Sequence, residues 1–185
     1  RLSQIYATLG SYNFIVEENY PEAFEAFEEA SRISEEVKDI VGLALASYWY
    51  GVALSFNCEF EKSAQYIQMA LNVNVAVNNL WGISAIKGDL AYFSYFYEGK
   101  INLGFETTHE AVRIAEESGD IFSKTVAYTM HGILCYGKRF LEEAEKHMLE
   151  GVEFSERINL QSRNAGTRFY LGETYFEMRD FPRSK

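Results

Sequence analysis

The feature that most constrains the fold of this chain is a repeat of about 40 residues. Small residues recur at the third and tenth positions after an apolar anchor, as Ala23 and Ala30 do after Tyr20. The anchors step by 40, 41, 40 and 40 residues, and they are Tyr20, Phe60, Ile101, Leu141 and Phe181. Self-similarity at such a period is typical of an array of stacked structural units, each of which contacts its neighbours.

A second series of residues, out of phase with the first, marks the start of another helix in each unit. Its members each precede an apolar residue, and they are Asp39, Asn79, Asp120 and Asn159. Asp and Asn side chains accept hydrogen bonds from the free amides of a first helical turn. Pro21 and Pro182 each follow an anchor, where a first turn tolerates a missing amide. Each unit is therefore expected to contain two helices.

Coarse boundaries follow from the two series. The predicted first helices lie near 2–17, 40–57, 80–98, 121–137 and 161–178, and the second helices near 21–37, 60–77, 101–117 and 141–157. Small residues allow a neighbouring helix to approach closely, while Phe27 and Met148 fill the space between. The segment NYPEAFEAFEEA begins a second helix at residues 19–30, and its glutamates cover the face toward solvent.

The pattern resembles the tetratricopeptide repeat (TPR) in its longer form of about 40 residues, a class found in multidomain signalling and scaffold proteins. Leu171-Gly172, Tyr175 and Asp180-Phe181 stand as in the first helix and turn of that motif. The resemblance covers nearly the whole chain. It implies an all-α fold, a right-handed α-α superhelix of antiparallel helix pairs; another helical solenoid is the alternative.

One unit departs from the motif. Tyr92 stands where Gly51, Gly132 and Gly172 stand in the other units, so the third unit is expected to pack differently. We predict a single array over 1–185, and its units lie at about 1–38, 39–78, 79–119, 120–158 and 159–185 (the last truncated). No initiator Met or targeting segment opens the chain, which we interpret as an internal piece of a longer protein.

Composition excludes several classes of protein. The net charge of −10 disfavours nucleic acid and anionic membranes as partners, because the surface would repel phosphate. The longest uncharged stretch, residues 40–58, carries Ser, Asn, Tyr and Gly and makes a poor membrane span. Cys58 and Cys135 show no CxxC or zinc spacing, so a reducing, cytoplasmic setting is the default expectation.

Enzyme motifs are not found in the sequence. His109, His131 and His147 are spread over separate units, with no HExxH pair and no glycine-rich phosphate loop. Acidic clusters such as Glu28-Glu29 are interpreted as solvent faces, and Cys135 as a small core residue. We therefore expect no enzyme activity, no cofactor and no metal.

The two helix types differ in polarity, and this difference suggests a function. The first helices are apolar nearly all round; residues 40–57 carry no charge. Such a helix must be surrounded or must line a surface that something else covers. In the repeats that this chain resembles, first helices line a concave groove that holds ligand peptides. Carried over residue by residue, the predicted groove comprises Tyr48, Phe56, Asp89, Phe93, Phe96, Tyr97, Tyr136 and Phe169. Further positions of that set are Val52, Ser55, Thr129, Ile133, Glu173 and Phe176.

The groove residues also indicate a kind of partner. Some TPR-like grooves clamp the carboxylate end of a chaperone tail with Lys, Arg and Asn, but here Asp89 and Thr129 occupy such positions. An apolar or basic-flanked peptide or helix therefore fits better. Two alternatives remain: the aromatic residues pack only between neighbouring helices, and Asp89 only bonds a neighbouring Tyr or backbone group.

Three functions are compatible with these features. The leading hypothesis is a non-catalytic protein-interaction module. The alternatives are a regulatory or sensor segment of a larger signalling ATPase, cyclase or transcription regulator, and a structural scaffold whose groove is filled by a second copy or by the parent chain. Residues 180–182 predict the start of a second helix, but only three residues follow them in this sequence. The last first helix would therefore lack its partner helix, and self-association through that end is expected.

Overall fold

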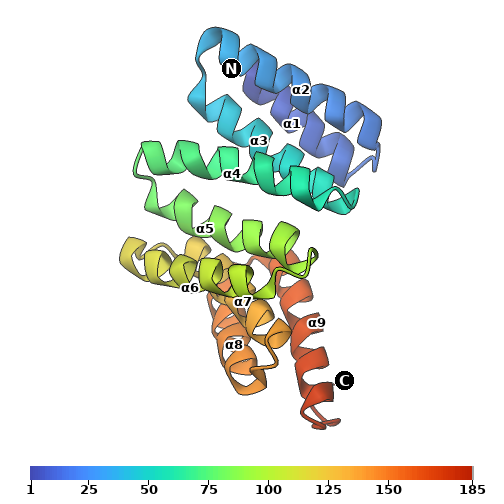
Figure 1. Cartoon of the computed structure of the whole chain (residues 1–185), viewed down its shortest axis with the longest axis vertical. Helices are drawn as coiled ribbons and strands as arrows, with labels where there is room; N and C mark the ends of the chain where they lie inside the picture. Colours follow the sequence, from blue (N-terminus) through green and yellow to red (C-terminus); the bar gives the residue numbers. More distant parts are fainter. Residues whose placement is uncertain (185) are drawn as a thin grey trace. The chain divides into compact units, whose positions relative to one another are not determined.

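The computed structural model describes residues 1–184, and of Ser162 and Arg163 it describes the backbone alone. This part of the chain is all-α, with nine α-helices, one π-helix and no strand (Figure 1). In chain order the elements are α1 (Leu2–Ile15), α2 (Tyr20–Val37), α3 (Ile40–Phe56), α4 (Phe60–Ala76), α5 (Leu80–Leu90), η1 (Ala91–Phe96), α6 (Ile101–Ser118), α7 (Ile121–Gly137), α8 (Leu141–Arg157) and α9 (Gln161–Glu177).

When η1 is counted as the end of the helix that begins with α5, the helix boundaries agree with those predicted from the sequence to within two residues. Asp39 and Asp120 cap α3 and α7, and their carboxylates accept the amides of Gly42 and Ser123. The prediction for Asn159 is wrong by one position. Asn159 adopts a left-handed backbone conformation in the turn, and Leu160 is the N-cap of α9.

One left-handed residue lies in every turn between helices, and one more follows α9. These residues recur every 20 positions, with a single step of 21 between Asn78 and Gly99, and they are Glu18, Lys38, Cys58, Asn78, Gly99, Gly119, Arg139, Asn159 and Arg179. A left-handed residue after a helix allows the chain to reverse direction and satisfies the last carbonyls. The turns therefore share one geometry, although only two of them use glycine.

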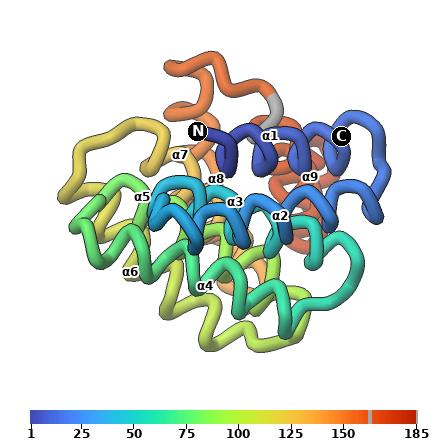
Figure 2. Tube along the Cα trace, turned by 90° about the horizontal axis from the view of Figure 1, so that it is seen from above, coloured from blue at the N-terminus to red at the C-terminus, as the bar shows by residue number. Residues whose placement is uncertain are grey.

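The chain forms two compact units, Arg1–Asn78 and Asn79–Lys185, whose boundary coincides with a predicted repeat boundary. In the first unit α1 packs against α2, α2 against α3, and α3 against α4. In the second unit the sequential pairs run from α5 with α6 to α8 with α9. Within each unit, helices that are consecutive in the chain lie side by side in both views (Figures 1 and 2). The single array over the whole chain stays a prediction.

Glycine allows the close approach of the two helices in a pair. A Cβ atom on Gly51 of α3 would lie 2.5 Å from Ile67 Cγ1 and 3.0 Å from the Ile67 amide nitrogen of α4. A Cβ atom on Gly132 of α7 would lie 2.5 Å from Met148 Cγ and 2.9 Å from the Met148 amide nitrogen of α8. Because backbone atoms are among these neighbours, any side chain would separate the helices.

The third pair solves the same packing problem differently, as the sequence predicted. Tyr92 cannot occupy a glycine position against α6, and the first helix changes at Ala91 from α to π geometry. Ala91 is fully buried, and its carbonyl oxygen lies 3.6 Å from where a Cβ on Gly104 of α6 would stand. A π turn holds one more residue than an α turn. The π-helix thus accommodates the extra residue of the 41-residue step. It also places a small residue, Ala91, at the contact with α6.

The C-terminal segment covers part of the last helix. Leu171 and Tyr175 are buried in the core of the second unit, and the guanidinium of Arg183 lies 4.3 Å from the centre of the Tyr175 ring. Arg183 also pairs with Glu145 and Asp180. Phe169 and Phe176 stay exposed, at 63% and 58%. Self-association through this end stays a prediction.

Candidate functional site

The π-helix and the residue that follows it bring the rings of Tyr92, Phe93, Phe96 and Tyr97 together at one end of the third pair. Tyr92 is central among them: its ring centre lies 5.1 Å from that of Phe93, 6.1 Å from Phe96 and 5.5 Å from Tyr97. The Tyr92 and Tyr97 rings meet edge to face, the arrangement that aromatic pairs prefer. π-Turns inside α-helices are frequently found at functional sites.

Tyr170 of α9 joins this group to two other helices. Its ring centre lies 6.1 Å from both Tyr92 and Phe96, 6.0 Å from Tyr136 of α7, and 5.3 Å from Phe169. We call the whole set the aromatic cluster, and its members are Tyr92, Phe93, Phe96, Tyr97, Tyr136, Phe169 and Tyr170. Five of the eight predicted groove residues therefore lie together in the second unit.

The members of the aromatic cluster differ in exposure. Tyr97 is 48% exposed and Phe169 is 63% exposed, whereas Phe93, Phe96 and Tyr136 are half-buried. The half-buried rings fix the geometry by packing between helices; for example, Phe96 lies against Gly137 of α7. The exposed rings present apolar area to solvent. The cluster is thus a rigid base with an open apolar rim.

Tyrosine hydroxyls give the cluster a polar edge. The hydroxyl groups of Tyr92 and Tyr97 are 3.0 Å apart and share a hydrogen bond. Burial raises the pKa of Tyr170, and hydrogen bonding with Tyr92 and Tyr97 raises it further, so its phenol stays neutral at physiological pH. Neutral hydroxyls can donate to or accept from a peptide backbone. The cluster therefore offers both contact area and hydrogen-bonding groups.

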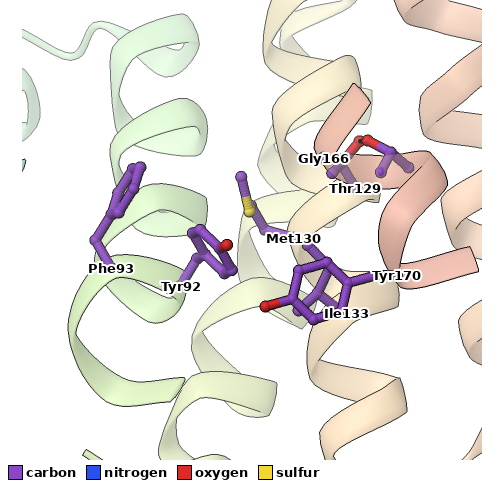
Figure 3. Close-up of a pocket in the computed structure, with 8 residues that line it drawn as sticks. Tyr92, Phe93, Thr129, Met130, Ile133, Gly166 and Tyr170 are labelled. Atoms are coloured by element: carbon purple, nitrogen blue, oxygen red, sulfur yellow. Dashed lines mark hydrogen bonds between the residues drawn. The ribbon is translucent and has the colours of Figure 1, made fainter. Parts of the chain in front are cut away.

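A small pocket adjoins the cluster. It has a volume of about 120 Å³, and its lining residues are Tyr92, Phe93, Thr129, Met130, Ile133, Gly166, Thr167 and Tyr170. Figure 3 shows these residues coming from three helices: η1, α7 and α9. The hydroxyl oxygens of Thr129 and Thr167 are 3.4 Å apart at one side. Thr129 and Ile133 were among the groove positions carried over from the resemblance.

The other three predicted groove residues lie elsewhere. Asp89 is only 2% exposed, so this geometry gives its predicted contact with a ligand no support. Phe56 belongs to the first unit, where it is 59% exposed and its ring meets that of Phe14 edge to face at 5.4 Å. Tyr48, also in the first unit, is half-buried beside Trp49.

Sequence reasoning missed two central residues, Tyr92 and Tyr170. Tyr92 was recognised only as an exception to a glycine position, and Tyr170 was not among the predicted groove positions. A signal for Tyr92 existed, because the 41-residue step between anchors marks the unit with one extra residue. Nothing in the spacing of the repeat distinguishes Tyr170.

Two potentially reactive side chains of the second unit, His131 and Cys135, are buried. His131 is 4% exposed and its Nδ1 atom lies 2.9 Å from the hydroxyl of Thr108. Burial, with His147 and His109 nearby, lowers the pKa of His131 to about 4. Burial raises the pKa of Cys135 to about 12, which keeps the thiol protonated. No group of three or more His, Cys, Asp or Glu side chains suited to a metal is found in the described part of the chain.

Comparison with solved structures identifies the fold. A Signal Transduction ATPase with Numerous Domains (STAND) protein with a TPR sensor, from Pyrococcus horikoshii, matches 94% of this chain with a TM-score of 0.75 and 15% identity. The apo form of RapI matches 98% with a TM-score of 0.79 and 16% identity. A putative kinesin light chain of Podosopora anserina with TPR-like repeats matches 100% with a TM-score of 0.71 and 12% identity. The fold is TPR-like.

The chain spans 27% of the length of the STAND protein, 66% of RapI and 91% of the kinesin light chain. No family model matches the sequence, and no curated protein matches it either. The structural likeness therefore establishes the fold but carries over no activity or partner. Among the helices of residues 1–184, none is both long and apolar enough to span a bilayer.

Proposed function

We propose that this chain is a non-catalytic protein-interaction module and that the aromatic cluster holds a peptide or helix of a partner protein. The observation that carries the proposal is the convergence of Phe93, Phe96, Tyr97, Tyr136 and Phe169 around the rings of Tyr92 and Tyr170. Tyrosine and other large aromatic residues dominate the energy of binding at many protein interfaces, because they bury much area for little loss of rotamer entropy.

The exposed rim explains how affinity arises. Covering a large apolar side chain completely is worth about 1.5–3 kcal/mol, and Tyr97 and Phe169 are each about half exposed or more. The half-buried rings beneath them are already ordered by packing, so little entropy is lost when a partner binds. A preorganised aromatic surface thus supports binding of an apolar face.

Acidic residues beside the cluster favour a partner with basic flanks. The pKa of Tyr136 is raised by burial and by the nearby carboxylates of Glu173 and Glu177. Glu173 is exposed one helical turn after Phe169 and Tyr170, and the chain as a whole has a net charge of −10. A lysine or arginine next to the apolar residues of the partner would complement this charge and speed association.

A sensor role within a larger signalling protein is the second candidate. It is favoured by the likeness to a STAND ATPase in which TPR-like repeats form a sensor and of which this chain spans 27%. In that role the aromatic cluster would hold either a segment of the same polypeptide or a free peptide that acts as the sensed signal. The residues of the cluster that contact the bound segment would be the same. The two candidates differ in what the bound segment belongs to.

A peptide-display selection tests the proposal. We would present a phage-displayed library of random peptides to the 185-residue chain and measure the affinities of enriched peptides by fluorescence polarisation. We expect enrichment of aliphatic or aromatic residues next to Lys or Arg. Tyr97→Ala and Phe169→Ala should each weaken binding by roughly tenfold, because each removes an exposed ring that the peptide covers.

Leu149→Ala is the matched control. Leu149 is 46% exposed on α8, so its truncation removes similar apolar surface away from the aromatic cluster. It should leave peptide affinity unchanged. Failure to enrich any peptide, or equal affinity of the Tyr97→Ala variant and the parent chain, would overturn the proposed function.

A further inference from the structure

Gly166 leaves a space in the second unit that side chains fill in other repeats. The same position of the repeat lies six residues before Gly51, Gly132 and Gly172, and it holds Leu45, Val126 and Gly166 respectively. Leu45 packs on a core of alanines that includes Ala7 of α1. The Leu45 side chain thus faces the preceding first helix.

Val126 shows what Gly166 lacks. It is fully buried, and its Cγ1 atom reaches to 3.2 Å from where a Cβ atom on Gly88 of α5 would stand. At Gly166 a Cβ atom would meet no atom within 4 Å. Gly166 is exposed and lines the pocket between η1, α7 and α9, so the place that an aliphatic side chain takes one repeat earlier stays open there.

The size of the pocket restricts what can fill it. Its volume of about 120 Å³ is below the roughly 150 Å³ of an apolar cavity that binds benzene. Most of its lining is apolar, from Met130, Ile133 and the rings of Tyr92, Phe93 and Tyr170. A branched aliphatic group of four carbons suits this space better than an aromatic ring or a charged group.

The position of the pocket links it to the acidic edge of the cluster. Tyr170 lines the pocket and its ring also contacts that of Tyr136. Glu173 and Glu177 lie near enough to Tyr136 to raise its pKa, in addition to the effect of burial. Glu177 already pairs with Arg139 at 2.7 Å, while Glu173 is exposed. A residue next to the one in the pocket therefore meets negative charge.

We propose that this pocket is a specificity site that takes one leucine-sized aliphatic side chain of a partner peptide, with a basic residue beside it. The inserted side chain completes the packing that Val126 completes within the repeat itself. The inference rests on the proposed function, since it assigns the residue that the partner inserts. It also makes Gly166 a specificity-determining residue.

Methyl NMR on the 185-residue chain tests the pocket without any partner. The probes are N-acetyl-leucinamide, N-acetyl-alaninamide and N-acetyl-phenylalaninamide, and the reporters are the methyl groups of Met130 and Ile133. Leucinamide should shift both reporters and bind roughly tenfold more tightly than alaninamide, because it buries three more carbons in a partly open site. Phenylalaninamide should bind more weakly than leucinamide. N-acetyl-Leu-Lys-amide should bind more tightly than N-acetyl-Leu-Glu-amide.

Gly166→Val provides the decisive variant, because it restores the residue found at position 126. It should abolish the leucinamide shifts while the rest of the methyl spectrum is retained. The matched control is Ala165→Val, which adds similar bulk at an exposed neighbouring position outside the pocket lining. If Gly166→Val disturbs the fold, Gly166→Ala serves instead and should weaken leucinamide binding by several-fold.

Equal binding of leucinamide and alaninamide, or unchanged leucinamide shifts in Gly166→Val, would overturn the pocket assignment. The result is separable from the proposed function. If displayed peptides bind the Tyr97→Ala variant more weakly but bind the Gly166→Val variant as well as the parent chain, the aromatic cluster remains the binding surface and the pocket assignment is wrong. Leucinamide binding without any enriched peptide would retain the pocket and overturn the wider proposal.

Discussion

The same substitution, glycine to alanine, should change stability in opposite directions at two helical positions of the second unit. Alanine is favoured over glycine in a helix interior by about 1 kcal/mol. At Gly166 a Cβ atom meets nothing within 4 Å, so Gly166→Ala should keep this whole gain. The variant should therefore be more stable than the parent chain.

At Gly132 the added carbon meets α8. It would lie 2.5 Å from Met148 Cγ, 2.9 Å from the Met148 amide nitrogen and 3.1 Å from the Ala144 carbonyl oxygen. The Met148 side chain can turn away, but the backbone atoms yield only if α7 and α8 move apart. Overpacking of this kind costs about 1–3 kcal/mol, which cancels the helical gain and leaves a net loss of up to about 2 kcal/mol.

Thermal and urea unfolding followed by circular dichroism would measure the difference. The two variants should differ by about 1–3 kcal/mol in unfolding free energy, or roughly 5 °C in Tm for a chain of this size. Gly166→Ala should melt above the parent and Gly132→Ala below it. A Gly132→Ala chain that melts as high as Gly166→Ala would show that close contact between α7 and α8 does not require glycine, and the packing argument would be wrong.

Three further predictions concern stability. Lys38→Gly should raise the unfolding free energy by about 1 kcal/mol in urea titrations, because Lys38 holds a left-handed conformation (φ 58°) that glycine adopts without strain. Ala111→Phe should lower it by about 1–3 kcal/mol, since Ala111 is fully buried; an unchanged urea midpoint would contradict the helix register. The third concerns His131, whose folded-state pKa of about 4 lies below its ordinary 6.5. As the pH falls, the imidazole of His131 is protonated in the unfolded chain before it is protonated in the folded chain. The unfolding free energy should therefore fall by up to about 3 kcal/mol between pH 6.5 and 4, and His131→Phe should flatten that part of the curve of stability against pH.

The helix boundaries and pairings were predictable because they follow from short-range chemistry that repeats. A carboxylate at Asp39 or Asp120 caps a first turn, and an absent side chain at Gly51 or Gly132 lets two helices touch. Each requirement acts on a few neighbouring residues and leaves a spacing in the sequence. Tyr92, which stands at the glycine position of this pattern, also indicated that the third unit differs.

The candidate site was only partly predictable, because it depends on how one extra residue is accommodated. The 41-residue step shows that the residue is present, but not that it is absorbed at Ala91 by π geometry. That choice decides which rings of the first helix meet Tyr170. Asp89 illustrates the limit, since its place in the repeat indicated a groove position and its side chain is buried. The pocket depends on Gly166, which a pattern of apolar residues does not mark.

The π-helix has a consequence at the level of the gene. Each added residue advances the direction of later side chains by about 100° in an α-helix, so one inserted codon would normally turn every following residue of that helix away from its partner. Here η1 absorbs the added residue, and α6 begins after the same kind of left-handed turn, at Gly99, as the other helices. Units after the insertion keep the 20-residue spacing of their turns. One added codon is therefore compatible with the regular turn spacing of the later units, because its effect on side-chain direction stays within one repeat.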